Sequence, residues 1–344
     1  MSEPRSVVGP SGGVPSAPWV DAQAAVLLAQ RGHAWLLHGP SGLGQYDLAM
    51  RLVRAWLCRI PRADGACGVC SSCHAIDVRA HADLCVLMPE AAMLELGWPL
   101  AEKAQAELDD KKRKPSKEIR VEALRESVEF SQRTSAGERG KAVLVYPAER
   151  MNQVSANALL MTLEEPAGDV KFVLASEAAH LLLPTIRSRC LGHAMWWPAG
   201  DEAVAWMVGC GVDAAMAPGL LRISGGRPSD ALVLALRGRD PSLWALLPKA
   251  AQRGDLSLVR DWSMKEIVHT LHKLCHDLQL VGQGAQPRFF AAQDLPKPAP
   301  QRVLSDWGRE LADTMRTMEH PFHPGLMQEA LASRAQIALN SANT

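Results

Sequence analysis

The sequence has no net charge and no long apolar run. Its 37 acidic side chains cancel its 37 basic ones, so overall charge gives no reason to expect nucleic-acid binding by the chain alone. No apolar stretch approaches the length that spans a membrane, and the N-terminus lacks the basic-then-apolar pattern of a secretory signal. We therefore expect a soluble, cytoplasmic protein. Internal repeats are also absent, and 344 residues suffice for two or three domains.

Short apolar runs alternate with helical patterns through the first 200 residues. The runs that resemble buried strands lie at 34–37, 81–87, 142–145 and 171–175. The segments between them carry apolar residues at helical spacing, as at 119–130 and 153–164. Strands separated by helices predict a doubly wound parallel sheet. After Pro198 the pattern is helical, so we predict an α/β fold followed by an all-α region, preceded by a mobile arm at 1–17.

The turn after the first strand has the glycines of a phosphate loop but not its charged end. The glycines are Gly39, Gly42 and Gly44. Such a loop cradles phosphate with backbone N–H groups, and it normally ends in a Lys that balances phosphate charge and a Ser or Thr that binds magnesium. Gln45 and Tyr46 stand at those two positions. The sequence predicts a degenerate loop, which is either a bare turn or a nest that binds nucleotide without hydrolysing it.

The acidic residues that hold magnesium are missing as well. In phosphate-loop ATPases a later strand ends in Asp-Glu, which holds the metal and polarises the attacking water. Here the strand at 142–145 runs into Tyr146, and Glu149 lies too far along the turn for that role. These two independent losses argue against ATP hydrolysis.

Four of the eight cysteines crowd into one short segment. They are Cys58, Cys67, Cys70 and Cys73. Thiolates favour tetrahedral zinc, and four of them leave no open position for water or substrate. We therefore predict a structural zinc site that orders a loop too short to bury much apolar surface. An iron–sulfur cluster, a redox thiol pair and free cysteines are the alternatives.

Two further segments carry basic residues. Residues 187–190 read Arg-Ser-Arg-Cys, and an arginine neutralises charge that develops on a γ-phosphate, even one bound by a neighbouring subunit. The same arginines are equally explained as surface charges.

We interpret residues 89–117, which end in the basic run 111–114, as an exposed insertion. Such a basic run is more often a solvated loop than a contact to DNA phosphate.

Together these motifs resemble the clamp-loader ATPases of the AAA+ class. Residues 157–166, Asn-Ala-Leu-Leu-Met-Thr-Leu-Glu-Glu-Pro, look like the family's long helix motif, with Met161 in place of a Lys. Residues 172–176 resemble its sensor-1 strand. Residues 224–232 look like its sensor-2 segment, with Ser229 where active members place an arginine.

The Ser-Arg-Cys and cysteine motifs strengthen the resemblance. Ser188, Arg189 and Cys190 match a family motif whose arginine acts on the adjacent subunit, and the four cysteines match the family's zinc module. Motor subunits keep the phosphate Lys, the Asp-Glu and the sensor-2 Arg. This chain lacks all three, which resembles a non-hydrolysing member of the family.

The resemblance implies three domains and a role in an assembly. The domains are an AAA+ α/β domain at 1–197 with the zinc module at 58–73, a small helical lid at 198–238 and a helical collar at 239–344. The chain would be a stator in the clamp loader of a bacterial DNA polymerase holoenzyme, with no ATPase activity of its own. Arg189 would reach a neighbouring ATP site, and Ser188 and Cys190 would set the turn that aims it. The implied partners are motor and delta-type subunits and, through the complex, the sliding clamp and primed DNA.

Two other hypotheses belong to different classes. One is a motor-type ATPase that tolerates Gln45, for which Arg51 or Arg54 would have to supply the missing positive charge. The other is a zinc-dependent nucleic-acid-binding module whose surface is the cysteine cluster and the basic run 111–114. The neutral overall charge and the lack of interleaved basic and aromatic residues near the cluster count against the second.

Overall fold

The computed structural model describes residues 15–318 and 323–341, in two compact units. The first unit comprises the described part of Met1–Gly211 together with Arg227–Val233. The second comprises the described parts of Val212–Gly226 and Leu234–Thr344. Most of the arm predicted at 1–17 lies outside the described residues. The three domain boundaries implied by the family resemblance stay a prediction.

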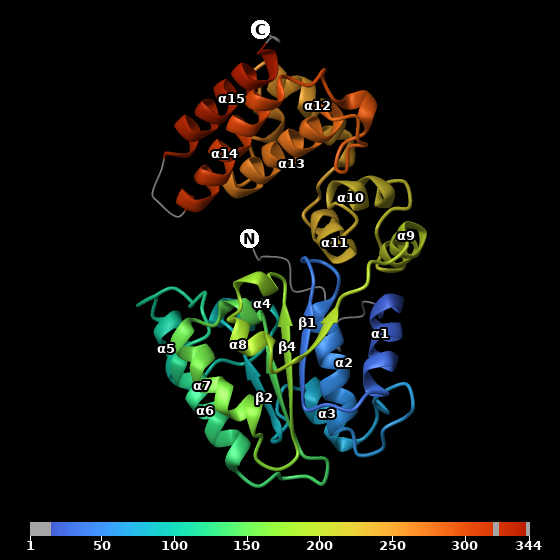
Figure 1. Cartoon of the computed structure of the whole chain (residues 1–344), viewed down its shortest axis with the longest axis vertical. Helices are drawn as coiled ribbons and strands as arrows, with labels where there is room; N and C mark the ends of the chain where they lie inside the picture. The colour runs from blue at the N-terminus through green and yellow to red at the C-terminus, as the bar shows by residue number, and fades with distance from the viewer. Residues whose placement is uncertain (1–14, 319–322, 342–344) are drawn as a thin grey trace. The chain divides into compact units, whose positions relative to one another are not determined.

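A five-stranded parallel sheet forms the centre of the first unit (Figure 1). Its strands are β1 (Ala34–His38), β2 (Leu84–Leu87), β3 (Lys141–Val145), β4 (Val170–Ser176) and β5 (Leu191–Ala194). They are ordered β2-β3-β4-β1-β5, and every neighbouring pair is parallel. Because β1 lies between β4 and β5, the phosphate loop leaves the sheet from an interior strand.

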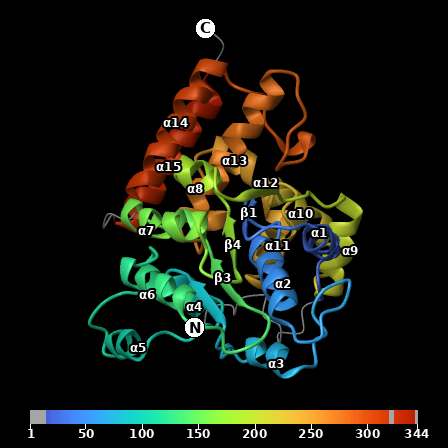
Figure 2. The same cartoon turned by 60° about the horizontal axis from the view of Figure 1, so that its bottom comes forward.

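Helices lie on both sides of this sheet, as Figure 1 shows. One side carries α1 (Pro18–Leu28), α2 (Gln45–Leu57) and α3 (Ser71–Asp77), and the other carries α5 (Glu102–Asp109), α6 (Val121–Gln132) and α7 (Gln153–Glu164). In Figures 1 and 2 α5 lies beside α6. The first unit also contains the helices α4 (Glu90–Glu95), α8 (Pro184–Arg187) and α9 (Gly200–Gly209).

Residues at both ends of α7 determine where this helix begins and ends. The side chain of Asn152 accepts a hydrogen bond from the Ser155 N–H at 2.9 Å, which caps the first turn. The helix ends at Glu164, two residues before Pro166, which lacks the N–H needed to continue it. The side chains of Leu159 and Leu163 are buried in the core against the sheet.

The described part of the second unit is helical. Its helices are α10 (Ala217–Ile223), α12 (Pro241–Gln252), α13 (Met264–Gly282), α14 (Gln301–Thr317) and α15 (Pro324–Asn340), and α11 (Pro228–Leu236) passes from the first unit into it. A capping box formed by Ser263 and Glu266 begins α13. The fully buried carboxylate of Asp277 accepts three successive backbone N–H groups, those of Arg288, Phe289 and Phe290, at 2.7–3.0 Å. These bonds fix the connection from α13 to α14.

The predicted fold class, α/β followed by all-α, is confirmed by this architecture. The four predicted strands correspond to β1–β4, whereas β5 was not predicted. Among the described residues, no helix is both long and apolar enough to cross a membrane.

Candidate functional site

The loop between β1 and α2 has a backbone that requires its glycines. Gly42 and Gly44 have φ values of 78° and 93°, in the region that disfavours residues with a Cβ. At Gly42 a Cβ would also lie 2.7 Å from the carboxyl group of Asp230. At Gly39 a Cβ would lie 3.0 Å from the side chain of Met195. The loop therefore keeps the shape of a phosphate-binding turn.

Gln45 turns its side chain back onto this loop. Its Nε2 donates hydrogen bonds to the carbonyl oxygens of Gly39 at 3.0 Å and Pro40 at 2.7 Å. The residue is 2% exposed, so its amide hydrogens are used inside the loop. Where a lysine would extend its charge toward phosphate, Gln45 stabilises the turn itself.

Tyr46 and Tyr146 stand at the two positions where a hydrolytic site holds magnesium, and their rings contact each other. The ring centroids are 5.3 Å apart. The Tyr46 hydroxyl accepts a hydrogen bond from the indole N–H of Trp98 at 2.8 Å, and the Tyr146 hydroxyl donates to Glu177 at 2.9 Å. Burial raises the pKa of both tyrosines above the ordinary value, so both are neutral phenols. Two aromatic rings thus lie where a hydroxyl and a carboxylate would bind the metal.

Three carboxyl groups surround these rings without forming a metal site. Burial raises the pKa of Asp47 to about 7 despite the attraction of Arg51, and burial also raises the pKa of Glu177. Glu149 accepts the backbone N–H of Glu177 at 3.2 Å, and its second oxygen is buried without a hydrogen-bond partner. Within the described ranges, the cysteine cluster is the one group whose ligand atoms are close enough to share a metal ion.

The segment that resembles sensor-2 returns to the loop within the first unit. Asp230 accepts a hydrogen bond from the Ser41 hydroxyl at 2.9 Å and pairs with Arg227 at 3.2 Å. Arg227 also donates to Ser41 at 2.8 Å, and the backbone N–H of Ser229 donates to the Gly42 carbonyl at 3.1 Å. An ion pair therefore covers Ser41 and Gly42, and Ser229 contributes its backbone there.

The four predicted zinc ligands come together. The Sγ–Sγ distances among Cys58, Cys67, Cys70 and Cys73 include 3.6, 3.8, 3.8 and 4.0 Å, and all four sulfurs lie within 4.8 Å of one another. A tetrahedron with zinc–sulfur bonds of about 2.3 Å has sulfur–sulfur edges of about 3.8 Å. The N–H groups of Cys67 and Cys73 point at the sulfurs of Cys58 and Cys70. No disulfide joins the four, and their geometry fits a tetrahedral metal ion.

The Ser-Arg-Cys motif lies between α8 and β5. Arg189 forms an ion pair with Glu164, and its side chain is 33% exposed. It also donates to the Thr185 carbonyl at 3.0 Å, which the Ser188 hydroxyl reaches at 3.1 Å. Cys190 packs against the sheet core, where burial raises its pKa to about 12. Cys190 therefore anchors the turn, Ser188 shapes it, and Arg189 reaches the surface.

Trp98 belongs to the site, although no sequence motif pointed to it. The insertion at 89–117 was predicted to be exposed, which is wrong at this position because the Trp98 side chain is 7% exposed. Besides its bond to Tyr46, the indole ring lies 4.4 Å from the guanidinium of Arg79. A tryptophan inside an otherwise charged insertion is the signal that could have revealed it.

Comparison with known proteins shows that the chain is similar to subunits of DNA polymerase III. A family model described as DNA polymerase III, delta subunit, matches residues 23–195. The chain is 38% identical to DNA polymerase III subunit delta′ of Pseudomonas aeruginosa over 61% of this chain and 58% of that protein. It is 33% identical to the protein of the same name from Escherichia coli K12, over 63% of this chain and 60% of that protein. The alignments thus span about three fifths of these relatives' length. A gamma subunit-related protein from Thermotoga maritima superposes with a TM-score of 0.47 at 16% identity, over 92% and 98% of the two chains.

Proposed function

The chain belongs to the family described as DNA polymerase III, delta subunit, and from this premise we propose that it is the delta′ subunit of a bacterial clamp loader. In this role the chain is a stator without ATPase activity. Motor subunits of the gamma or tau type hydrolyse ATP, a delta-type subunit completes the complex, and the assembly places the sliding clamp on primed DNA in the cytoplasm.

The contact between Tyr46 and Tyr146 carries the proposal that this chain hydrolyses nothing. Magnesium needs oxygen ligands from the loop and from the end of the later strand, and both positions hold neutral phenols. Gln45 is bonded within the loop and offers no charge to a phosphate. Chemistry must therefore be supplied by another subunit.

Arg189 is the residue through which this chain would take part in that chemistry. A guanidinium that reaches the surface from an anchored turn is suited to neutralise charge on a γ-phosphate held by a neighbour. Ser188 and Cys190 position it by the contacts described above.

The test uses the complete complex with clamp and primed DNA. Arg189→Ala should slow single-turnover ATP hydrolysis at one class of sites by about 10³-fold, the range in which arginine fingers act, and should slow clamp loading. Arg187→Ala is the matched control because Arg187 is an exposed arginine two residues away. Equal rates for the two variants would refute the role of Arg189, and ATP turnover by the isolated chain would refute the stator assignment.

Zinc held by Cys58, Cys67, Cys70 and Cys73 is proposed as the structural cofactor. Bound zinc would cross-link the segment before α3 and would leave no coordination position for a substrate. The chain's own part is to keep the sulfurs at tetrahedral spacing and to direct backbone N–H groups at them.

Contacts within the first unit speak against the two other hypotheses. Arg51 pairs with Asp21 at 2.8 Å and Arg54 pairs with Asp77, so both cations are engaged away from Gln45. In the basic run, Arg113 pairs with the carboxylates of Glu90 and Glu107. These pairs take up charge that a motor site or a nucleic-acid surface would need.

A further inference from the structure

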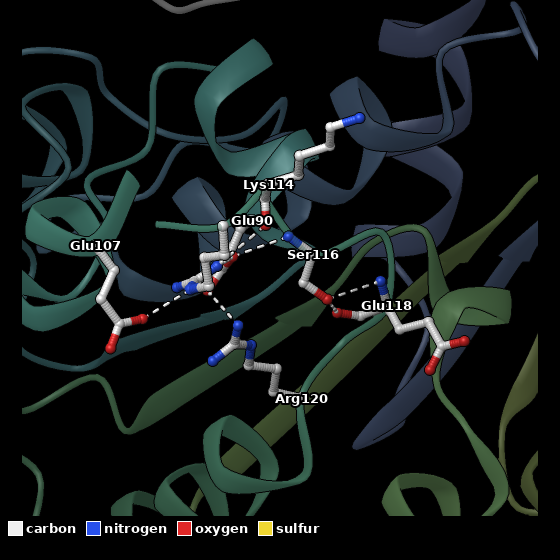
Figure 3. A network of polar contacts seen from close by, with 7 residues as sticks. Glu90, Glu107, Lys114, Ser116, Glu118 and Arg120 are labelled. Atoms are coloured by element: carbon white, nitrogen blue, oxygen red, sulfur yellow. Dashed lines mark hydrogen bonds and ion pairs between the residues drawn. The ribbon is translucent and has the colours of Figure 1, made fainter. Parts of the chain in front are cut away.

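The insertion at 89–117 is fastened at its two ends by one buried carboxylate. Glu90, at the start of α4, is 7% exposed. Both of its oxygens accept hydrogen bonds from the guanidinium of Arg113, and one also accepts the Ser116 N–H at 2.9 Å (Figure 3). Arg120 adds an ion pair at 3.3 Å. We call the bidentate Glu90–Arg113 pair the clasp, because it closes the segment between these residues into a loop.

Within the clasped segment, Trp98 reaches toward two other parts of the first unit. Its indole N–H donates to Tyr46, in the first turn of α2, and its ring stacks on Arg79, which follows α3. Arg79 in turn donates to the Leu96 carbonyl at 3.4 Å. One side chain of the insertion therefore joins the phosphate-loop helix to the helix that carries the zinc module.

The rest of the insertion is little buried. Helix α5 has no buried residue, and the exposed side chain of Lys112 pairs with that of Asp110, which is also exposed. Apart from Pro89, the buried side chains of the insertion are those of Glu90 and Trp98. The fold does not need such an arrangement for stability alone, since an exposed loop could connect β2 to α6 without entering the core.

We propose that the insertion is an internal strap: the clasp seats Trp98 on Tyr46, and this contact keeps Tyr46 against Tyr146 in the space that a magnesium–nucleotide would need. The strap rests on the proposed function and deepens it, because the chain's own side chains occupy the degenerate site. For a metal–nucleotide to enter, Tyr46 would have to leave a buried position and abandon the hydrogen bond from Trp98.

Amide hydrogen exchange on the full chain tests the coupling directly. Arg113→Ala opens the clasp, and it should accelerate exchange at least tenfold both in 90–113 and in the first turn of α2 at 45–49. Lys112→Ala is the matched control and should change neither. Faster exchange in 90–113 with an unchanged exchange rate in the first turn of α2 would overturn the proposal, because the clasp would then stabilise the insertion alone and not Tyr46.

A second experiment asks whether Trp98 excludes nucleotide. In a Gln45→Lys background, which restores the phosphate charge, Trp98→Phe removes the indole donor and keeps an aromatic ring. Calorimetry with magnesium–ATP should show at least tenfold tighter binding by the Gln45→Lys, Trp98→Phe double variant than by the Gln45→Lys single variant. Equal affinities, or no binding by either variant, would overturn the proposal. Both experiments use the isolated chain, so their failure is separate from failure of the Arg189 test in the complex.

Discussion

Arg189 is held by Glu164, the last residue of α7. The two side chains are 33% and 45% exposed, and ion pairs in such positions contribute about 0–1 kcal/mol to stability. Breaking this ion pair should therefore cost little free energy, which is compatible with the proposed contact of Arg189 with a phosphate on a neighbouring subunit. The ion pair orients the guanidinium of Arg189 away from its turn but is weak enough to be replaced by another partner.

Replacing Glu164 should consequently free Arg189 without damaging the fold. We expect Glu164→Gln to change the free energy of unfolding by less than about 1 kcal/mol. The complex reconstituted with Glu164→Gln should hydrolyse ATP at least as fast as the complex that contains the unmodified chain, whereas the complex with Arg189→Ala should be slower. A Glu164→Gln variant as slow as Arg189→Ala would mean that the ion pair itself, rather than the free arginine, is needed.

Local patterns in the sequence predicted the elements but not their contacts. The interior strands β1, β3 and β4 each contain an uninterrupted apolar run, at 34–37, 142–145 and 172–175, so this pattern identifies them without tertiary information. Strand β5 escaped prediction because it is short, contains Gly192 and exposes most of its side chains. As an edge strand it is defined by pairing with β1, which lies far away in the sequence.

In the candidate site, too, the sequence predicts which residues are replaced but not which contacts the replacements make. The replacement of lysine at Gln45 and of the acidic residue at Tyr146 is visible in the sequence, and so is the spacing of the four cysteines. The sequence does not show that Gln45 bonds back to its own loop, nor that Trp98 contacts Tyr46. The contact of Trp98 with Tyr46 joins residues that are 52 positions apart. Single-sequence patterns report neighbours along the chain, whereas the bond between Trp98 and Tyr46 depends on how the insertion packs.

The cysteine cluster should hold one zinc ion per chain. Cys58→Ser removes one of four thiolates, so we expect zinc content measured by mass spectrometry to fall from about one per chain to a small fraction of that. Loss of the ion should also expose the segment before α3 to trypsin. Cys210→Ser, outside the cluster, is the control and should retain the metal. Equal zinc content in the two variants, or iron in place of zinc, would contradict this assignment.

In the second unit, Asp277 should be the most sensitive carboxylate to substitution. It is fully buried and accepts three backbone N–H groups, so Asp277→Ala leaves those donors unsatisfied. We expect a loss of about 2–5 kcal/mol in the free energy of unfolding, measured by urea titration. Asp261→Ala, with a side chain 89% exposed, should cost less than about 0.5 kcal/mol. Similar losses for both would show that the α13–α14 connection does not depend on Asp277.

Asp47, in the first turn of α2, should make stability depend on pH. Burial raises its pKa from 3.8 to about 7 in the folded chain. Below about pH 4, Asp47 carries its proton in both the folded and the unfolded state. Between about pH 4 and 7 it ionises in the unfolded state only, so the free energy of unfolding falls as the pH rises. Above about pH 7 this loss is complete and reaches up to about 4 kcal/mol. Asp47→Asn removes this titration, so its free energy of unfolding relative to the unmodified chain should rise from pH 5 to pH 8 in urea titrations. The slope is the measure, because the unpaired amide of the Asn carries its own constant cost. Asp21→Asn, at an exposed site on α1, controls for loss of one negative charge. A pH-independent difference between Asp47→Asn and the unmodified chain would show that Asp47 is ionised in the folded protein.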